Sequence, residues 1–231
     1  MDAMHLSDRL ATVAAYVPDG ARLADIGSDH AYLPANLILN KRIKFAVAGE
    51  VAQGPLENAE QEINKHHLND QLIPRLADGL AAIQPEDRID TVVIAGMGGR
   101  LIQQILEAGS NATYKRLILQ PNIDVDAVRT WLQANQYQIT DERVLLDDGH
   151  YYEVVVAEPG TVEYNAMQLA FGPVNMVKND SIWRQKWERE QGRMEKIMQQ
   201  LEAANQTQAE AYRNYQEQVA QIKEVLAHAG A

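Results

Sequence analysis

Apolar runs alternate with helical patterns along roughly the first 160 residues of this chain, and four of these runs end in short glycine-rich or acidic segments. The four segments are 25–34, 49–50, 77–79 and 95–99. Alternation of this kind predicts a parallel sheet covered by helices. The carboxyl ends of parallel strands meet at one edge, where ligands bind near the reversal of strand order. The sequence therefore predicts one ligand site built from four strand-end corners.

A hairpin is predicted where the alternation ends. Asp148-Gly149 separates an apolar run over 137–146 from another over 151–158, which is the pattern of an antiparallel hairpin. The usual dinucleotide dehydrogenase half-fold lacks this ending, and Rossmann-like methyltransferases have it. The preceding strands are expected at 22–26, 45–50, 72–76, 90–95 and 115–120, and helices at 31–40, 55–68 and 123–134.

Residues 164–231 have a different, helical pattern. Gly172-Pro173 interrupts the first part, and apolar residues then recur at spacings of three and four, as in a coiled coil. A polar segment over 203–209 fits the turn of an antiparallel helix pair. We therefore expect two domains, an α/β domain over 1–163 and a helical coiled-coil domain over 164–231.

Composition excludes several classes of protein. The chain has 231 residues and no cysteine, which rules out disulfides, thiolate metal sites and a cysteine nucleophile. No run approaches the roughly 18 apolar residues of a membrane span, and the amino end lacks signal-peptide character. We expect a cytoplasmic protein with no membrane partner.

The net charge of −11 argues against a nucleic-acid partner, but its distribution weakens that argument. All of the excess acid lies in residues 1–180, whereas residues 181–231 carry seven basic and seven acidic side chains. Basic residues crowd the range 184–196. They form either a local basic face or an ordinary solvated helix surface.

Several motifs together carry a family resemblance. They are Asp-Ile-Gly-Ser-Asp-His-Ala-Tyr-Leu-Pro at 25–34, Gly-Glu at 49–50, Ala-Asp-Gly-Leu at 77–80, Ala-Gly-Met-Gly-Gly at 95–99 and Leu-Gln-Pro-Asn at 119–122. With the helical tail, they resemble the bacterial tRNA adenine-N1 methyltransferases that act on adenine 22. The resemblance covers essentially the whole chain. It implies an S-adenosylmethionine-dependent enzyme with a class I Rossmann-like fold and a tail that helps hold tRNA.

The corners supply the expected cofactor site. Glu50 lies 23 positions after Gly27, where a carboxylate can accept hydrogen bonds from ribose hydroxyls. Asp78 could accept from the adenine amine, with the Gly79 amide nearby. Either acid could instead be an exposed loop carboxylate, and Gly27 could form a turn without a ligand. The expected cofactor-binding residues are Asp25, Gly27, Ser28, His30, Glu50, Val51, Asp78, Gly79, Ala95, Gly96, Met97 and Gly98.

Two absences bear on the target atom. Methylation at C5 of pyrimidines generally needs a cysteine, and methylation of exocyclic amines usually uses an Asn- or Asp-Pro-Pro-aromatic motif, which is replaced here by 95–99. Ring atom N1 of adenine has a lone pair and needs chiefly to be positioned. Asp29 could offset the sulfonium charge or take a proton, and both roles stay open. The expected catalytic residues are Asp29, Met97 and Asn122.

The target base must leave its stack and needs an aromatic or apolar slot. The candidates for this slot are Tyr32, Met97, Tyr151 and Tyr152, each of which could instead be ordinary packing. Gln120, Pro121 and Asn122 could read the Watson–Crick edge of adenine or form a plain turn. Arg184 and Arg193 are the expected tRNA contacts of the tail.

No histidine pair has metal-ligand spacing, so no metal site is expected. We expect a monomer, with a dimer through the tail as the alternative. Two other functions stay open: a small-molecule methyltransferase, favoured by the acidic surface, and a non-catalytic cofactor-binding module that acts through the coiled coil.

Overall fold

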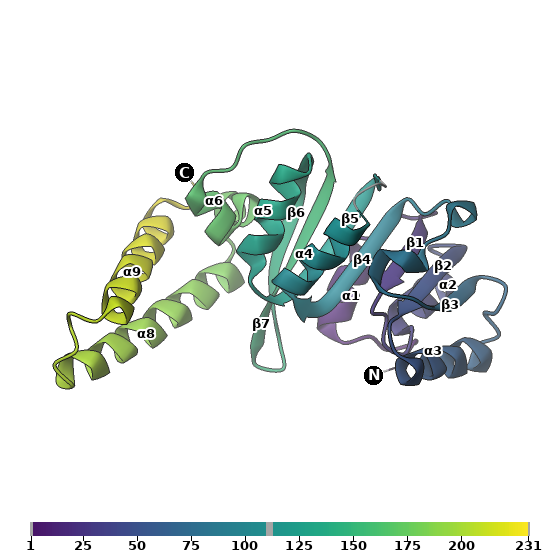
Figure 1. The fold of residues 1–231 in the computed structure, drawn as a ribbon, viewed down its shortest axis with the longest axis horizontal. Coiled ribbons are helices and arrows are strands. Elements are labelled where there is room, and N and C mark those ends of the chain that lie inside the picture. The colour runs from purple at the N-terminus through teal and green to yellow at the C-terminus, as the bar shows by residue number, and fades with distance from the viewer. Residues whose placement is uncertain (1, 110–112, 231) are drawn as a thin grey trace.

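In the part of the chain that the structure describes, seven strands form one mixed sheet in the order β3-β2-β1-β4-β5-β7-β6 (Figure 1). The computed structural model describes residues 2–109 and 113–230, so Met1 and Ala231, the outer ends of the two expected domains, lie outside it. The strands are β1 (Arg22–Ile26), β2 (Phe45–Glu50), β3 (Leu72–Leu76), β4 (Thr91–Gly98), β5 (Arg116–Ile123), β6 (Tyr137–Asp147) and β7 (His150–Pro159).

Helices cover both faces of this sheet. They are α1 (Asp8–Ala15), α2 (Tyr32–Leu39), α3 (Gln53–Lys65), α4 (Gly99–Ala108) and α5 (Val125–Ala134), with short 3₁₀ turns η1 (Gly79–Ala82) and η2 (Pro85–Asp87). Helices α1 to α3 bury their apolar residues in one core, and α4, α5 and η1 bury theirs in a second core on the opposite face. Because strands β1 and β4 contribute to both cores, they read as continuous apolar runs.

The strand order reverses between β1 and β4. The chain proceeds from β1 outward to β3, then crosses to the other side of β1 and continues through β4 and β5, all in parallel. Strand β7 then pairs antiparallel with β5 and with β6. The expected ligand edge is therefore the carboxyl end of β1 and β4, where the reversal creates a crevice.

Two strands run further than the sequence pattern indicated. We expected β4 to end at Ala95 and the segment 120–122 to end β5, but β4 continues to Gly98 and β5 to Ile123. The two extensions pair with each other, Met97 with Pro121 and Gly98 with Ile123, after a register shift next to Gly96. Gly96 has a φ of 81°, which lets the strand bulge and then resume its pairing.

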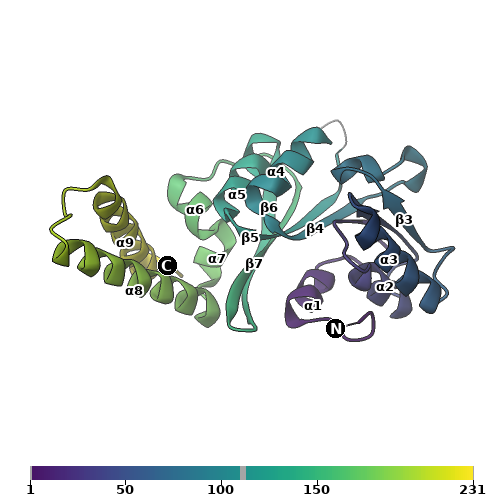
Figure 2. The ribbon, with the colours of Figure 1, turned by 60° about the horizontal axis from the view of Figure 1, so that its bottom comes forward.

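The carboxyl-terminal segment, after β7, forms helices and no strand within the described residues. It consists of α6 (Ala166–Phe171), α7 (Pro173–Lys178), α8 (Ser181–Ala203) and α9 (Glu210–His228). Helices α8 and α9 lie side by side and extend away from the sheet in both views (Figures 1 and 2). Trp183 is fully buried among them and donates through Nε1 to the Phe171 carbonyl at 3.0 Å. The core that these helices share also includes Val144 of β6.

A buried ion cluster joins the helical segment to the sheet. Arg129 of α5 is fully buried and donates to Glu142 at 2.7 Å and to Glu153 at 2.5 Å. Glu142 also accepts from the backbone amides of Val174 and Asn175, at 2.9 and 3.2 Å. Lys186 of α8 pairs with Glu153. Charged side chains from four elements, α5, β6, β7 and α8, thus neutralise one another in the interior.

The pKa values of the two acids reflect these partners. Burial raises the pKa of Glu142, and the attraction of Arg129 does not fully oppose it. Burial acts in the same direction on Glu153, but Lys186 and Arg129 together lower its pKa to about 2. Both cations are therefore needed to keep the cluster neutral.

Candidate active site

The loop after β1 has an unusual backbone. Gly27 has a φ of 68°, and Asp29, His30 and Ala31 follow with φ values of 38°, 60° and 54°. Left-handed backbone at a residue other than glycine is costly, and such residues concentrate at functional sites. A Cβ on Gly27 would overlap the Met97 side chain, which shows how closely β4 approaches this loop. The first corner is therefore held in an unusual conformation beside the strand reversal.

Two buried carboxylates stand behind this loop. Asp25 is 4% exposed, and burial raises its pKa to about 7, with the nearby Glu50 carboxylate acting in the same direction. The Ser28 hydroxyl opposes this by donating to Asp25 at 2.5 Å. Burial also raises the pKa of Glu50, which accepts from the backbone N–H of Asp29 at 2.5 Å. Glu50 thereby fixes the loop through its backbone.

The ends of β2 and β3 supply the next two corners. Val51 directly follows Glu50 and is 71% exposed, so an apolar side chain faces outward next to a buried carboxylate. Asp78 is exposed at the start of η1, and Gly79 follows with a φ of 52°. The structure therefore places these residues at the same edge of the sheet as Gly27, as the parallel pairing requires.

The extended ends of β4 and β5 are joined by side-chain amides. Gln120 is fully buried and accepts the Gly96 N–H at 3.1 Å, while its Nε2 donates to Asn122 at 3.0 Å. Asn122 closes the ring by donating to the Gly96 carbonyl at 2.8 Å. Arg9 of α1 donates to the same Gln120 oxygen at 2.6 Å. The sequence analysis missed Arg9, because it lies in no motif and reaches this edge only through the packing of α1.

The aromatic candidates occupy three different places. Tyr32 stacks on His30 with ring centroids 5.0 Å apart, directly after the left-handed loop. Tyr152 lies beneath the Arg9 guanidinium, 5.5 Å from it, and packs partly into the core. Tyr151 lies on the other face of β7, toward the helical segment, near Arg189. Met97 packs against both Gly27 and the second core. Of the aromatic candidates, Tyr32 thus flanks the first corner directly, and Met97 contacts the same corner from β4.

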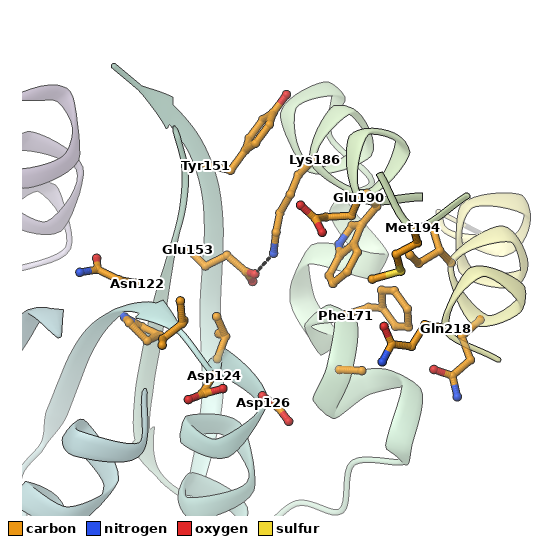
Figure 3. A pocket seen from close by; sticks show the side chains of 17 residues that line it. Asn122, Asp124, Asp126, Tyr151, Glu153, Phe171, Lys186, Glu190, Met194 and Gln218 are labelled. Carbon is orange, nitrogen blue, oxygen red and sulfur yellow. Dashed lines mark hydrogen bonds and ion pairs between the residues drawn. The ribbon is translucent and has the colours of Figure 1, made fainter. Parts of the chain in front are cut away.

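A cavity of about 470 Å³ lies between this edge and the helical segment (Figure 3). Figure 3 shows Asn122, Asp124 and Asp126 on the sheet side, with residues of α8 and α9 opposite. The Lys186–Glu153 ion pair lies in its wall. The cavity therefore connects the end of β5 with the tail. Its other lining residues include Pro121, Ile123, Tyr151, Phe171, Trp187, Glu190, Met194 and Gln218.

The two arginines expected to contact tRNA have different surroundings. Arg184 is partly buried and donates to the Leu226 carbonyl at 3.1 Å and to Asn179 at 3.0 Å, so it stabilises the end of α9. Arg193 is exposed and pairs with Glu190 at 2.9 Å. Arg193 is thus the better placed of the two for a ligand.

Residues 2–109 and 113–230 contain neither a cluster of metal ligands nor a helix that could span a membrane. No group of three or more His, Asp or Glu side chains in these ranges is arranged to hold a metal ion. None of the helices described combines the length and apolar character of a membrane-spanning segment.

Comparison with known proteins identifies the family. Residues 23–224 match the family model described as TrmK: tRNA (adenine(22)-N(1))-methyltransferase. The chain belongs to this family. A curated family member, the tRNA (adenine(22)-N(1))-methyltransferase of Bacillus subtilis strain 168, is 39% identical over 238 aligned positions, which cover 99% of this chain and all of the relative.

Solved structures of the family have the same fold. The B. subtilis m1A22 tRNA methyltransferase TrmK superposes with a TM-score of 0.87 at 38% identity, covering 96% of this chain and 99% of that one. Streptococcus pneumoniae Sp1610, solved with S-adenosyl-L-methionine, gives 0.88 at 40% identity, covering 96% and 100%. M. capricolum TrmK, solved with S-adenosyl-homocysteine, gives a TM-score of 0.87 at 28% identity, covering 97% of this chain and 99% of that one.

These findings confirm the predicted family, the Rossmann-like α/β fold and the enzyme class, a tRNA adenine-N1 methyltransferase. The roles of individual site residues stay predictions.

Proposed function

We propose that this chain transfers a methyl group from S-adenosylmethionine to N1 of adenine 22 in tRNA, with residues 1–163 as the catalytic domain and 164–231 as a coiled-coil domain that holds the tRNA. The observation that supports this most is the convergence of four corners on the reversal between β1 and β4. The site of action is then the cytoplasm, with a monomer as the active form.

The corners fit the cofactor in chemical type. S-adenosylmethionine carries ribose hydroxyls, an adenine ring, a methionine group and a sulfonium-bound methyl, which is the group it supplies. Glu50 would accept from the ribose hydroxyls, because a carboxylate that accepts one backbone N–H keeps further acceptor capacity. Val51 would cover the adenine ring, and Asp78 with Gly79 would bind its polar edge. The remaining contacts are assigned to Asp25, Gly27, Ser28, His30, Ala95, Gly96, Met97 and Gly98.

The residues of this chain act mainly by positioning. The N1 lone pair of adenine attacks without prior deprotonation, so catalysis requires that N1 and the methyl group be held in line, about 3–3.5 Å apart. Met97 and Asn122 lie on the paired extensions of β4 and β5 and would shape the place where the base sits. The methylated base is cationic, and the side chain of Asp29, 76% exposed beside the first corner, would stabilise it.

The base slot follows from the same geometry. Tyr32 would provide a stacking face beside the first corner, because its ring is already oriented by His30. Gln120, Pro121 and Asn122 would contact the Watson–Crick edge, and Tyr151 would contact a flanking nucleotide from the cavity wall. Arg193, and less directly Arg184, would contact the tRNA backbone from α8.

Transfer of tritiated methyl from S-adenosylmethionine to unmodified tRNA tests the proposal, with nucleoside digestion of the product. We expect a labelled 1-methyladenosine peak that disappears when adenine 22 of the transcript is replaced by guanine. Label in another nucleoside, or no label in any tRNA, would refute the reaction.

Glu50→Gln tests the ribose assignment. The amide keeps the size of the side chain but replaces one acceptor by a donor, so cofactor affinity measured by calorimetry should fall about tenfold or more. Glu57→Gln, on the exposed side of α3, is the matched control. Unchanged affinity in a folded Glu50→Gln variant would contradict the assignment.

Arg193→Glu tests the contact of the tail with tRNA. Arg184 is unsuitable alone, because its loss also removes one hydrogen bond to Leu226 of α9 and one to Asn179 at the end of α7. We expect weaker tRNA binding and a smaller salt dependence for Arg193→Glu, with cofactor affinity unchanged. A filter-binding curve identical to wild type would remove the tail contact.

A further inference from the structure

Arg9 is a cation in an unusual place. It lies on α1, before the first strand, yet its guanidinium reaches the extended ends of β4 and β5. Its Nη1 donates to Gln120 at 2.6 Å, and a Cβ on Gly96 would lie 3.2 Å from the same nitrogen. The Tyr152 ring lies below it at 5.5 Å. Two independent contacts therefore fix this charge beside the strand ends that face the ligand edge.

The charge of Arg9 is not neutralised by an acid. In the ranges 2–109 and 113–230, no carboxylate oxygen lies within 4.0 Å of its side-chain nitrogens, although its backbone N–H donates to Asp147 at 3.0 Å. Among nearby cations, Arg100 pairs with Asp124, Lys186 with Glu153 and Arg193 with Glu190. Arg189 instead contacts the Tyr151 ring and the Gly149 carbonyl, at the tip of the hairpin and away from the ends of β4 and β5. In a chain with a net charge of −11, an uncompensated and fixed cation indicates an anionic ligand.

The guanidinium also has donors to spare. Arginine carries five N–H donors in a planar fork, and Gln120 accepts from Nη1 alone. The aromatic ring below occupies a face of the guanidinium and leaves its N–H edge accessible. The half-buried side chain keeps little freedom to lose on binding. These features suit bidentate recognition of two oxygens of one anionic group.

The chemistry of the reaction argues against a contact with the target base. A guanidinium N–H donated to N1 of adenine would occupy the lone pair that must attack. It would also stand close to a base that becomes cationic on methylation. Resting on the proposed function, we infer that Arg9 binds an oxyanion at the catalytic edge, either the carboxylate of the cofactor's methionine group or a phosphate next to the target adenine.

The variants Arg9→Met and Arg9→Lys separate these sources. Arg9→Met removes the charge and keeps the length of the side chain. Gln120 still accepts the Gly96 N–H in that variant, so no buried acceptor is left without a donor and the fold should persist. Lys44→Met removes one exposed charge just before β2, at the opposite edge, and serves as the matched control.

Calorimetry with two small ligands tests the carboxylate. If Arg9 binds it, Arg9→Met lowers the affinity for S-adenosylmethionine about tenfold to a hundredfold and leaves 5′-methylthioadenosine, which lacks the carboxylate, unaffected. Salt-dependent filter binding with tRNA tests the phosphate. If Arg9 binds it, Arg9→Met weakens tRNA binding and lowers the salt slope by about 0.7–0.9, with cofactor affinity unchanged. Arg9→Lys keeps the positive charge, so it should retain part of the affinity, for the cofactor or for tRNA, that Arg9→Met loses.

The proposal is overturned if folded Arg9→Met matches Lys44→Met in cofactor affinity, tRNA affinity and salt slope. Equal losses for S-adenosylmethionine and 5′-methylthioadenosine would also overturn it, because they would show a general distortion of the edge. These outcomes differ from a failure of the proposed function, which would show as wild-type protein that forms no 1-methyladenosine in tRNA.

Discussion

Replacement of Arg129 by methionine should destabilise the protein strongly. The change removes two ion pairs and the hydrogen bonds to the Leu169 and Ala170 carbonyls, at 3.1 and 3.2 Å. Glu153 keeps Lys186 as a partner, whereas Glu142 keeps only neutral backbone donors. One buried carboxylate thus loses its compensating charge.

The expected loss in free energy of unfolding is about 3–5 kcal/mol, the cost of breaking a buried pair from one side. At about 2–4 °C per kcal/mol for a chain of this size, the melting temperature should fall by about 6–20 °C. The penalty should be larger at pH 8 than at pH 5. Burial raises the pKa of Glu142 already in wild type. Without Arg129, the folded protein therefore takes up a proton there more readily as the pH falls.

Urea unfolding followed by tryptophan fluorescence and far-ultraviolet circular dichroism measures both effects. Arg193→Met is the matched control, because it breaks an exposed pair with Glu190 and should cost less than about 1 kcal/mol. A loss for Arg129→Met below 1 kcal/mol, or equal to the control, would refute the reasoning. So would a penalty that is independent of pH.

Two further changes test other features of the fold. Gly99→Ala places a Cβ against the Asp124 carbonyl and should lower the free energy of unfolding by several kcal/mol. The control Gly54→Ala meets open space in α3, so its effect on stability should be neutral or favourable. Equal effects of the two variants in thermal melts would argue against the close packing of α4 on the end of β5. Asp25 has a pKa raised to about 7 by burial, so its contribution to stability is complete below its ordinary value near 3.8 and is lost as the pH rises to about 7. The stability of wild type relative to Asp25→Asn should accordingly fall between pH 4 and 7 and then level off. Urea titrations at several pH values measure this difference. A difference that does not change with pH would contradict a buried, protonated Asp25.

The sequence predicts the inner strands well, because their apolar runs are buried on both faces. Strands β1 and β2 occupy the expected ranges 22–26 and 45–50. The edge strand β3 is only partly buried, yet it also occupies its expected range, 72–76. The predicted ends of β4 and β5 were wrong, because glycine and proline usually end strands. Here Met97 and Pro121 pair across a bulge, and a pairing between distant segments leaves no trace in local pattern.

The site was predictable to the extent that it depends on strand ends. Gly27, Glu50 and Asp78 follow their strands directly, so parallel topology alone brings them to one edge. Arg9 was not predictable, because its place depends on how α1 packs beside β7 and not on any spacing. The cluster of Arg129 with two glutamates was equally hidden, since each member looks like a surface charge on an amphipathic element.

That ion cluster has a consequence for how such a chain can change over evolutionary time. The boundary near residue 164 divides the sequence by pattern, but Glu142 on β6 accepts from amides of α7, and Glu153 on β7 pairs with a lysine of α8. Without the helical segment, Glu142 would lose the amides of α7 and Glu153 would lose Lys186, so the two acids would share Arg129 as their cation. The cluster would then hold one buried negative charge in excess, and we expect a natural variant without the tail to carry an uncharged residue at position 142 or 153.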